Sequence, residues 1–209
     1  IQTFFSRKIA WKNLKIYSDK ISFSLRNINK VKNFAIGMTI ITGLSVLTSN
    51  VDKFYVSKYF NLETLGYYLL AWSIASGLFR IGIPVMQAFS PHFAELFSLN
   101  EIEKLKNRYL LSNKLIFLLL IPISITISLN SSLIIYAWTQ NAIVAENTAE
   151  ILSFLVLGSM FMICAYPSLS LMYSQKKIIL ILIFHIIGLS TTIIFFEINI
   201  NQYNLYYIY

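Results

Sequence analysis

Two neighbouring charges, Asp52 and Lys53, follow nineteen residues, Asn33 to Val51, that carry no charge. A charged side chain at the centre of a membrane helix costs at least ~2.5–3.5 kcal/mol, so such charges usually belong to binding or ion-translocation sites. A third interior charge, Arg80, presents a planar fork of donors that suits phosphate oxygens. We therefore take Asp52, Lys53 and Arg80 as candidate residues for contact with an ionic ligand.

Short polar side chains precede this pair at spacings of three or four residues, which predicts one polar face on a membrane helix. Such a face would line a water-filled cavity or contact other helices. If the helix enters the membrane near Asn33, Asp52 lies ~28 Å along its axis, close to the far edge of a ~30 Å apolar core. An outer-interface position for Asp52 and Lys53 is the alternative to a cavity position. The residues of this polar stripe are Thr39, Thr42, Ser45 and Ser49.

Other polar residues in the apolar runs allow simpler interpretations. Because neighbouring residues on a helix diverge by ~100°, we do not expect Asp52 and Lys53 to pair with each other. Arg80 lies ~24 Å along the second apolar run, so it could instead extend to cytoplasmic lipid headgroups. His185 has no second ligand or carboxylate at helical spacing, which favours a packed polar residue over a proton relay. Metal-ligand clusters, glycine-rich phosphate loops and nucleophile–base pairs do not occur in the sequence, so we expect no metal, cofactor or enzyme activity.

The composition is that of a membrane protein. Of the 209 residues, 56% are hydrophobic and 12% are charged, and the mean hydropathy is +0.64, whereas soluble domains carry about 25% charged residues. The net charge is +8, but the basic residues are grouped between apolar runs, which indicates membrane topology rather than nucleic-acid binding. The predicted fold is an all-α polytopic bundle of about five transmembrane helices. The runs are 33–60, 64–90, 115–137, 149–174 and 178–198.

The distribution of positive charge predicts the orientation. Fourteen of the seventeen lysines and arginines lie in alternate connecting segments, which the positive-inside rule assigns to the cytoplasm together with the N-terminus. Residues 1–32 are predicted to be a basic connector at the lipid surface. Residues 98–114 are predicted to be either an amphipathic surface helix that begins with a capping box at Ser98 and leads into the third span, or a solvated connector. The first residue, Ile1, and the aromatic tail at 199–209 lead us to expect a fragment of a longer protein.

Residues 51–91, VDKFYVSKYFNLETLGYYLLAWSIASGLFRIGIPVMQAFSP, resemble the polysaccharide (O-antigen, Wzx-like) flippases. These belong to the multidrug/oligosaccharidyl-lipid/polysaccharide exporter superfamily. The resemblance covers about residues 31–175 and fades after Lys177. Its features, in the family's order, are Asp52-Lys53, Leu65-Gly66-Tyr67-Tyr68 with Ala71, then Pro84, Ala88 and Pro91, the EIEKLKNRY segment, Ala137-Trp138-Thr139 and Tyr166-Pro167-Ser168-Leu169.

The resemblance implies that residues 33–198 are the second, C-terminal lobe of a two-lobe MATE-like exporter without its last helix, with the missing N-terminal lobe as partner. It also implies that the protein moves undecaprenyl-pyrophosphate-linked oligosaccharide units across the bacterial inner membrane, alongside polysaccharide assembly proteins. Asp52, Lys53 and Arg80 would then line the transport cavity. The alternatives are a cation-coupled multidrug antiporter, in which Asp52 would bind the ion or drug, and a non-transporting membrane component of polysaccharide assembly.

Overall fold

The computed structural model describes residues 25–206, with side chains for Lys32 and for residues 35–199. The chain divides into two compact units, residues 1–35 and 36–209. In the first unit only the beginning of helix α2 is described, so the predicted basic connector lies largely outside the described residues. Every regular element between residues 25 and 206 is helical, which confirms the all-α prediction.

Within the described range, five segments are long and apolar enough to cross a membrane, as the sequence predicts. They are Ala35–Tyr59, Leu62–Ser98, Ile102–Leu129, Ala142–Ser174 and Ile178–Asn199. The elements are α2 (Leu25–Tyr59), α3 (Leu62–Ala75), the 3₁₀ helix η1 (Ser76–Leu78), α4 (Phe79–Ser98), α5 (Ile102–Leu129), α6 (Ser131–Thr139), α7 (Ala142–Cys164), α8 (Tyr166–Ser174) and α9 (Ile178–Tyr206).

From Ile102 onward the segment 98–114 is helical and continues into the third span as the first half of α5. This agrees with the predicted helix that leads into that span, and it excludes the solvated connector. The predicted capping box, however, is wrong. The Ser98 hydroxyl donates to the Glu95 carbonyl instead, and Asn100 adopts a left-handed conformation that turns the chain tightly from α4 into α5. Burial of Leu105 holds this half of α5 against the bundle.

The structure of the helix ends explains the remaining differences between the predicted and the observed bounds of the spans. The Asn61 side chain caps α3 by accepting from the Thr64 amide at 2.8 Å, which starts the second span just before Thr64. Asn141 caps α7 in the same way, after a left-handed Gln140 ends α6. At the other end of the chain, α9 continues to Tyr206, so residues 199–206 extend the fifth helix rather than forming a separate tail.

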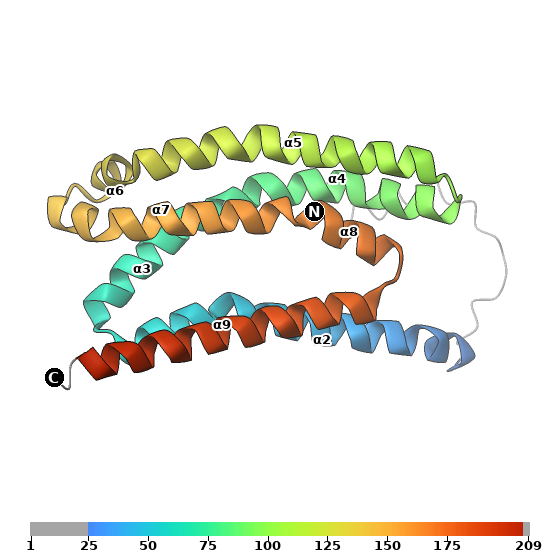
Figure 1. Cartoon of the computed structure of the whole chain (residues 1–209). Coiled ribbons are helices and arrows are strands. Elements are labelled where there is room, and N and C mark those ends of the chain that lie inside the picture. Colours follow the sequence, from blue (N-terminus) through green and yellow to red (C-terminus); the bar gives the residue numbers. More distant parts are fainter. Residues whose placement is uncertain (1–24, 207–209) are drawn as a thin grey trace, which may run out of the picture. The chain divides into compact units, whose positions relative to one another are not determined.

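The core of the unit 36–209 lies among α3, α4, α5 and α7 (Figure 1). Phe93, Leu120, Leu152 and Ile163 are fully buried there. Gly82 permits the close approach of α4 to α7, because any Cβ at this position would overlap the side chain of Ile163. This packing fixes the relative position of the helices that form one wall of the candidate site.

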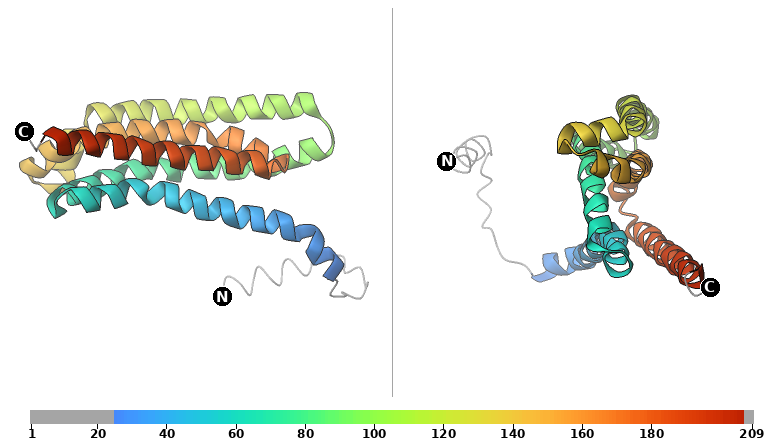
Figure 2. Two further views of the ribbon diagram at one scale, coloured as in Figure 1. Left: turned by 60° about the horizontal axis from the view of Figure 1, so that its bottom comes forward. Right: turned by 90° about the vertical axis from the view of Figure 1, so that its left-hand side faces the viewer.

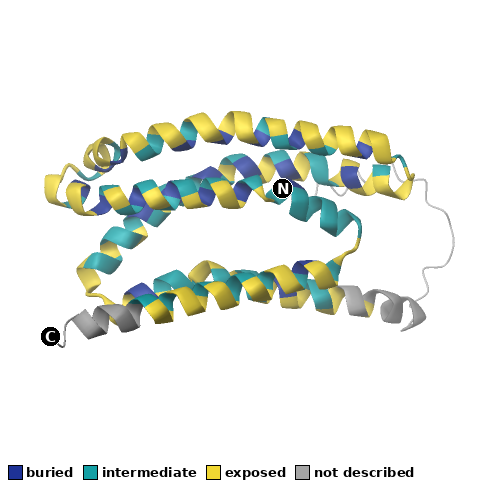
Figure 3. Cartoon of the chain, in the orientation of Figure 1, coloured by how far each residue is buried: buried dark blue, intermediate teal, exposed yellow. Residues whose placement is uncertain are grey.

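Helices α2 and α9 form a second group and run parallel to each other, because Gly37 meets Ile178 near their beginnings and Tyr55 meets Phe196 further along. The Tyr55 ring stacks on Phe196 with centroids 4.7 Å apart, and its hydroxyl donates to Glu197 at 2.8 Å. Most of the described side chains on both helices are exposed (Figure 3). Figure 2 shows α3 leading from the end of α2 back to the core.

Candidate functional site

A cavity of about 440 Å³ lies between the α2–α9 pair and the helices α4, α7 and α8. Its wall combines hydroxyl and amide groups with aliphatic and thioether side chains. The lining residues are Ser45, Thr48 and Ser49 from α2, Ile83, Met86, Gln87 and Ser90 from α4, Met162 from α7, Tyr166, Leu169, Ser170 and Tyr173 from α8, and His185 from α9.

The bundle side of this cavity presents five polar side chains without hydrogen-bond partners among the described residues. They are Gln87, Ser90, Tyr166, Ser170 and Tyr173. The hydroxyl oxygen of Ser170 is fully shielded from solvent and still has no partner within the described part of the chain. A buried hydroxyl without a hydrogen bond costs about 1–3 kcal/mol, so such a group is suited to accept a ligand or water.

The α2 side of the cavity is different, because the hydroxyl groups of Thr48 and Ser49 already donate hydrogen bonds within the helix. Thr48 donates to the Leu44 carbonyl at 2.8 Å, and Ser49 donates to the carbonyl of Ser45. Back-bonding to the carbonyl four residues earlier is the usual solution for a hydroxyl on a membrane helix. Ser45 lies 3.4 Å from Nε2 of His185. His185 is half-buried, lines the cavity and contacts α2, which agrees with the packed polar residue that the sequence favours.

The structure splits the predicted polar stripe. Ser45 and Ser49 line the cavity, whereas Thr39 and Thr42 are exposed and lie outside its lining. The cause is geometric. Each step of three residues turns a helix by ~300°, so a stripe with mostly three-residue steps drifts by ~140° between Thr39 and Asp52. Only the second half of the stripe, Ser45 and Ser49, faces the cavity.

Asp52 and Lys53 form a half-buried cluster with α3 instead of lining this cavity. The Tyr68 hydroxyl donates to Asp52. The Lys53 ammonium lies 3.6 Å from Oδ1 of Asp52 and 4.3 Å from the centroid of the Trp72 ring. The expectation that the two neighbours would not pair is therefore wrong, because the lysine stem is long enough to bring its ammonium back beside the carboxylate. The charges of this cluster compensate each other.

The cluster nevertheless lies close to the cavity along α2. Lys53 also donates to the backbone carbonyl of Ser49, a residue of the cavity wall. Ser49 and Lys53 are about one helical turn apart, or ~6 Å along the axis. Asp52 and Lys53 therefore stand just beyond the polar wall, at the end nearer α3.

Arg80 belongs neither to the lining of this cavity nor to the Asp52–Lys53 cluster. It is exposed in the first turn of α4, makes no ion pair with any described residue, and lines none of the described cavities. The second span extends from Leu62 to Ser98, so Arg80 lies midway along it rather than near one end. The structure thus brings Asp52 and Lys53 together but leaves Arg80 apart from them.

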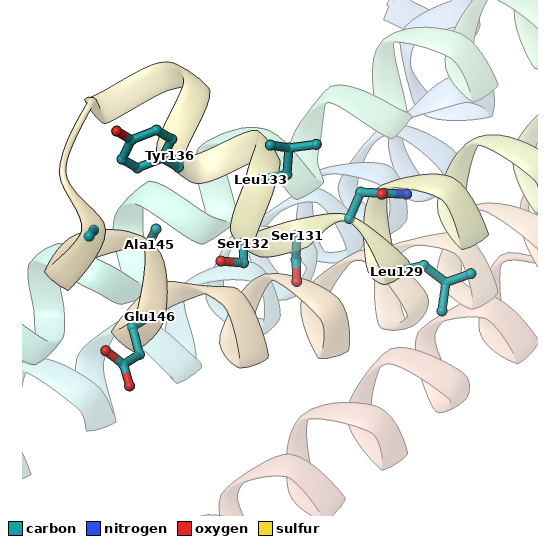
Figure 4. Close-up of a pocket in the computed structure, with 9 residues that line it drawn as sticks. Leu129, Ser131, Ser132, Leu133, Tyr136, Ala145 and Glu146 are labelled. Atoms are coloured by element: carbon teal, nitrogen blue, oxygen red, sulfur yellow. The ribbon is translucent and has the colours of Figure 1, made fainter.

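A second cavity, of about 650 Å³, surrounds the turns at the ends of α5, α6 and α7 (Figure 4). Ser131, Ser132 and Tyr136 supply hydroxyl groups, and Glu146 is its one charged lining residue. All of its walls come from consecutive elements at one end of the bundle, so it does not extend along the spans. No group of three metal-ligating side chains occurs among the described residues.

Most of the polar residues that line the first cavity are not among those that the sequence patterns indicate. Gln87 and Ser90 are three apart on α4, while Tyr166, Ser170 and Tyr173 follow at spacings of four and three on α8. Uncharged polar residues at helical spacing are the sequence signal for both sets, the same signal that marks the polar stripe of α2.

The fold and the cavity define a polytopic helical membrane protein whose spans enclose a largely uncharged polar site. The MatE family model matches residues 34–197, and the chain belongs to this family. The family lies within the multidrug/oligosaccharidyl-lipid/polysaccharide exporter superfamily, and its members are membrane transporters. Neither a curated protein nor a solved structure gives a significant match to the chain. The superfamily implied by the sequence resemblance is thus confirmed.

Proposed function

We propose that the protein is a flippase that moves undecaprenyl-pyrophosphate-linked oligosaccharide units across the bacterial inner membrane, with its N-terminus in the cytoplasm. The observation that carries the proposal is the set of unpaired, uncharged hydrogen-bonding side chains in the cavity between α4, α8 and the α2–α9 pair. The sequence resemblance to polysaccharide flippases supports the same cargo. Membrane lipids, the N-terminal lobe of the two-lobe architecture and polysaccharide assembly proteins are the partners in this proposal.

The chemistry of the cavity suits a sugar. A sugar hydroxyl both donates and accepts, and so do the hydroxyl groups of Tyr166, Tyr173 and Ser90 and the amide of Gln87. These groups offer hydrogen bonds without holding a charged ligand so tightly that it cannot leave. Ile83 and Met86 supply apolar surface for the less polar faces of a sugar ring.

The pyrophosphate of the cargo requires cationic contacts elsewhere. Lys53, one turn beyond the polar wall, and the exposed Arg80 are the proposed contacts, and Asp52 is the group that holds Lys53 in the absence of cargo. An anion would compete with Asp52 for the Lys53 ammonium.

A cation-coupled multidrug antiporter is less well supported by the same geometry. The described lining of the cavity contains no carboxylate to hold an organic cation. Asp52 lies outside that lining and is already bonded by Tyr68 and Lys53. A non-transporting membrane component has no use for unpaired polar groups between its spans, so this alternative is not favoured either.

The test is complementation of a bacterial strain that lacks its own O-antigen flippase. We expect the complete coding sequence to restore surface polysaccharide, measured on lipopolysaccharide gels. Gln87→Leu and Tyr173→Phe remove hydrogen-bonding groups from the cavity at little change in size, and each lost hydrogen bond should reduce export roughly 2- to 10-fold. Tyr136→Phe is the matched control, because it removes a hydroxyl from the second cavity only.

Membrane levels of each variant are compared by immunoblot. The proposal fails if the unsubstituted protein restores no polysaccharide but confers resistance to cationic drugs, which would favour the antiporter. If export is restored but Tyr136→Phe impairs it more than Tyr173→Phe, the cargo does not use the cavity between α4 and α8.

A further inference from the structure

A groove of about 410 Å³ lies at the turn between α4 and α5, at the end of the bundle opposite α6 (Figure 1). It shares no residue with the cavity described above. Its charged lining residues are Glu101, Lys104 and Arg108 at the α5 side and Glu95 at the α4 side, where His92 also lies. Because Glu101 and Lys104 compensate each other, a ligand in this groove meets the Arg108 cation on one side and the Glu95 carboxylate on the other.

The charged groups of the groove differ in whether they have an ion-pair partner. Lys104 pairs with Glu101 at 2.9 Å, and Glu95 lies 3.7 Å from His92, an ion pair only when the histidine is protonated. Arg108 forms no ion pair or side-chain hydrogen bond with any described residue. Among the described residues, the groove thus offers an unpaired guanidinium and a carboxylate whose one ion-pair partner is a histidine.

The groove also lies at the level where lipid headgroups would be. Arg108 is ~31 Å along α5 from Leu129, which matches the ~30 Å thickness of the hydrocarbon core. Leu99 and Leu111 line the same groove, and they are 60% and 40% exposed. Apolar surface beside opposite charges at this depth matches an amphipathic lipid.

We propose that this groove binds the headgroup of a zwitterionic phospholipid with a primary ammonium, phosphatidylethanolamine. Arg108 binds the phosphate, because its fork of donors matches two phosphate oxygens. Glu95 accepts a hydrogen bond from the ammonium, while Leu99 and Leu111 contact the start of the acyl chains. Phosphatidylcholine lacks an N–H to donate to Glu95, and phosphatidylglycerol brings a net negative charge that Glu95 repels.

The experiment measures lipid retention by the full chain. The purified protein is exchanged into nanodiscs with equal amounts of phosphatidylethanolamine, phosphatidylcholine and phosphatidylglycerol, and the retained lipids are identified by native mass spectrometry. We expect phosphatidylethanolamine to be enriched about fivefold, the effect of a partly exposed charge contact. Arg108→Gln should lower retention of all three lipids, whereas Lys106→Gln, on the same helix but outside the groove, should not.

Glu95→Gln distinguishes a zwitterion site from a simple phosphate site. Removing the carboxylate should abolish the preference for phosphatidylethanolamine over phosphatidylglycerol without reducing total retention. Equal or greater retention of phosphatidylglycerol by the unsubstituted protein would overturn the proposal, as would identical behaviour of Arg108→Gln and Lys106→Gln. Helicity by circular dichroism confirms that each variant is folded. The readout is lipid binding, so it is independent of the cargo proposed above.

Discussion

Replacing Gly82 with alanine tests the close packing of α4 against α7. An ideal Cβ at Gly82 would overlap Cγ2 of Ile163 and lie 3.5 Å from its Cβ. Ile163 is fully buried and β-branched, so its Cγ2 has little freedom to rotate away. Overpacking of this kind costs about 1–3 kcal/mol, and alanine recovers about 1 kcal/mol through its higher helix propensity. We expect a net loss of up to ~2 kcal/mol in the free energy of unfolding.

Two further variants make this expectation specific. Gly158 lies on α7, and no atom comes within 4 Å of a Cβ built there. Gly158→Ala should therefore stabilise the protein by ~0.5–1 kcal/mol through propensity alone. Ile163→Leu moves the branch one carbon outward and removes Cγ2 at constant volume, so it should recover most of the stability lost in Gly82→Ala.

The assay is unfolding of the purified protein in detergent micelles by increasing amounts of sodium dodecyl sulfate, followed by circular dichroism. Gly82→Ala should unfold at lower denaturant than the unsubstituted protein, and Gly158→Ala at the same or higher denaturant. Equal midpoints for the two alanine variants would refute the reasoning, because they would mean that α4 does not approach α7 closely at Gly82. If Ile163→Leu fails to restore stability, a contact other than that with Ile163 causes the loss in Gly82→Ala.

Two more variants test local contacts by the same unfolding assay. Tyr68→Phe removes the hydrogen bond to the half-buried Asp52 and should cost about 1–3 kcal/mol, while Tyr67→Phe, whose hydroxyl is exposed, should be nearly neutral; equal effects would contradict the buried contact. Asn141→Ala removes the side-chain cap of α7 and should cost about 1 kcal/mol, and an unchanged unfolding midpoint would argue against this cap.

Hydropathy was sufficient to predict the number of spans but not their ends. Apolar runs locate the part of a helix that lies in the hydrocarbon core, whereas helix ends depend on capping and on packing outside it. Asn61 and Asn141 begin their helices through side-chain hydrogen bonds. In the charged first half of α5, by contrast, the helical spacing of apolar residues predicts a helix, and the burial of Leu105 in the core agrees with it.

The sequence predicts only part of the candidate site, because contacts between helices have no local sequence signal. Charges stand out in an apolar sequence, so the sequence alone indicates Asp52 and Lys53. Their mutual contact depends on the rotamer of Lys53 and on the Trp72 ring from α3, neither of which has a sequence signal. The cavity itself is lined by uncharged residues such as Gln87 and Tyr173, which occur in many membrane helices without forming a site. Their convergence arises from the arrangement of the helices.

Helix α2 thus carries two kinds of polarity in succession, a neutral wall around Ser45 and Ser49 and a compensated ion pair one turn beyond it. Lys53 is held by a carboxylate, an aromatic ring and a backbone carbonyl, so its charge is available only to a ligand that displaces Asp52. Tyr68 would continue to hydrogen-bond Asp52 after that exchange, which lowers the cost of separating the pair. An anionic cargo could therefore engage Lys53, whereas a neutral sugar would leave the ion pair closed.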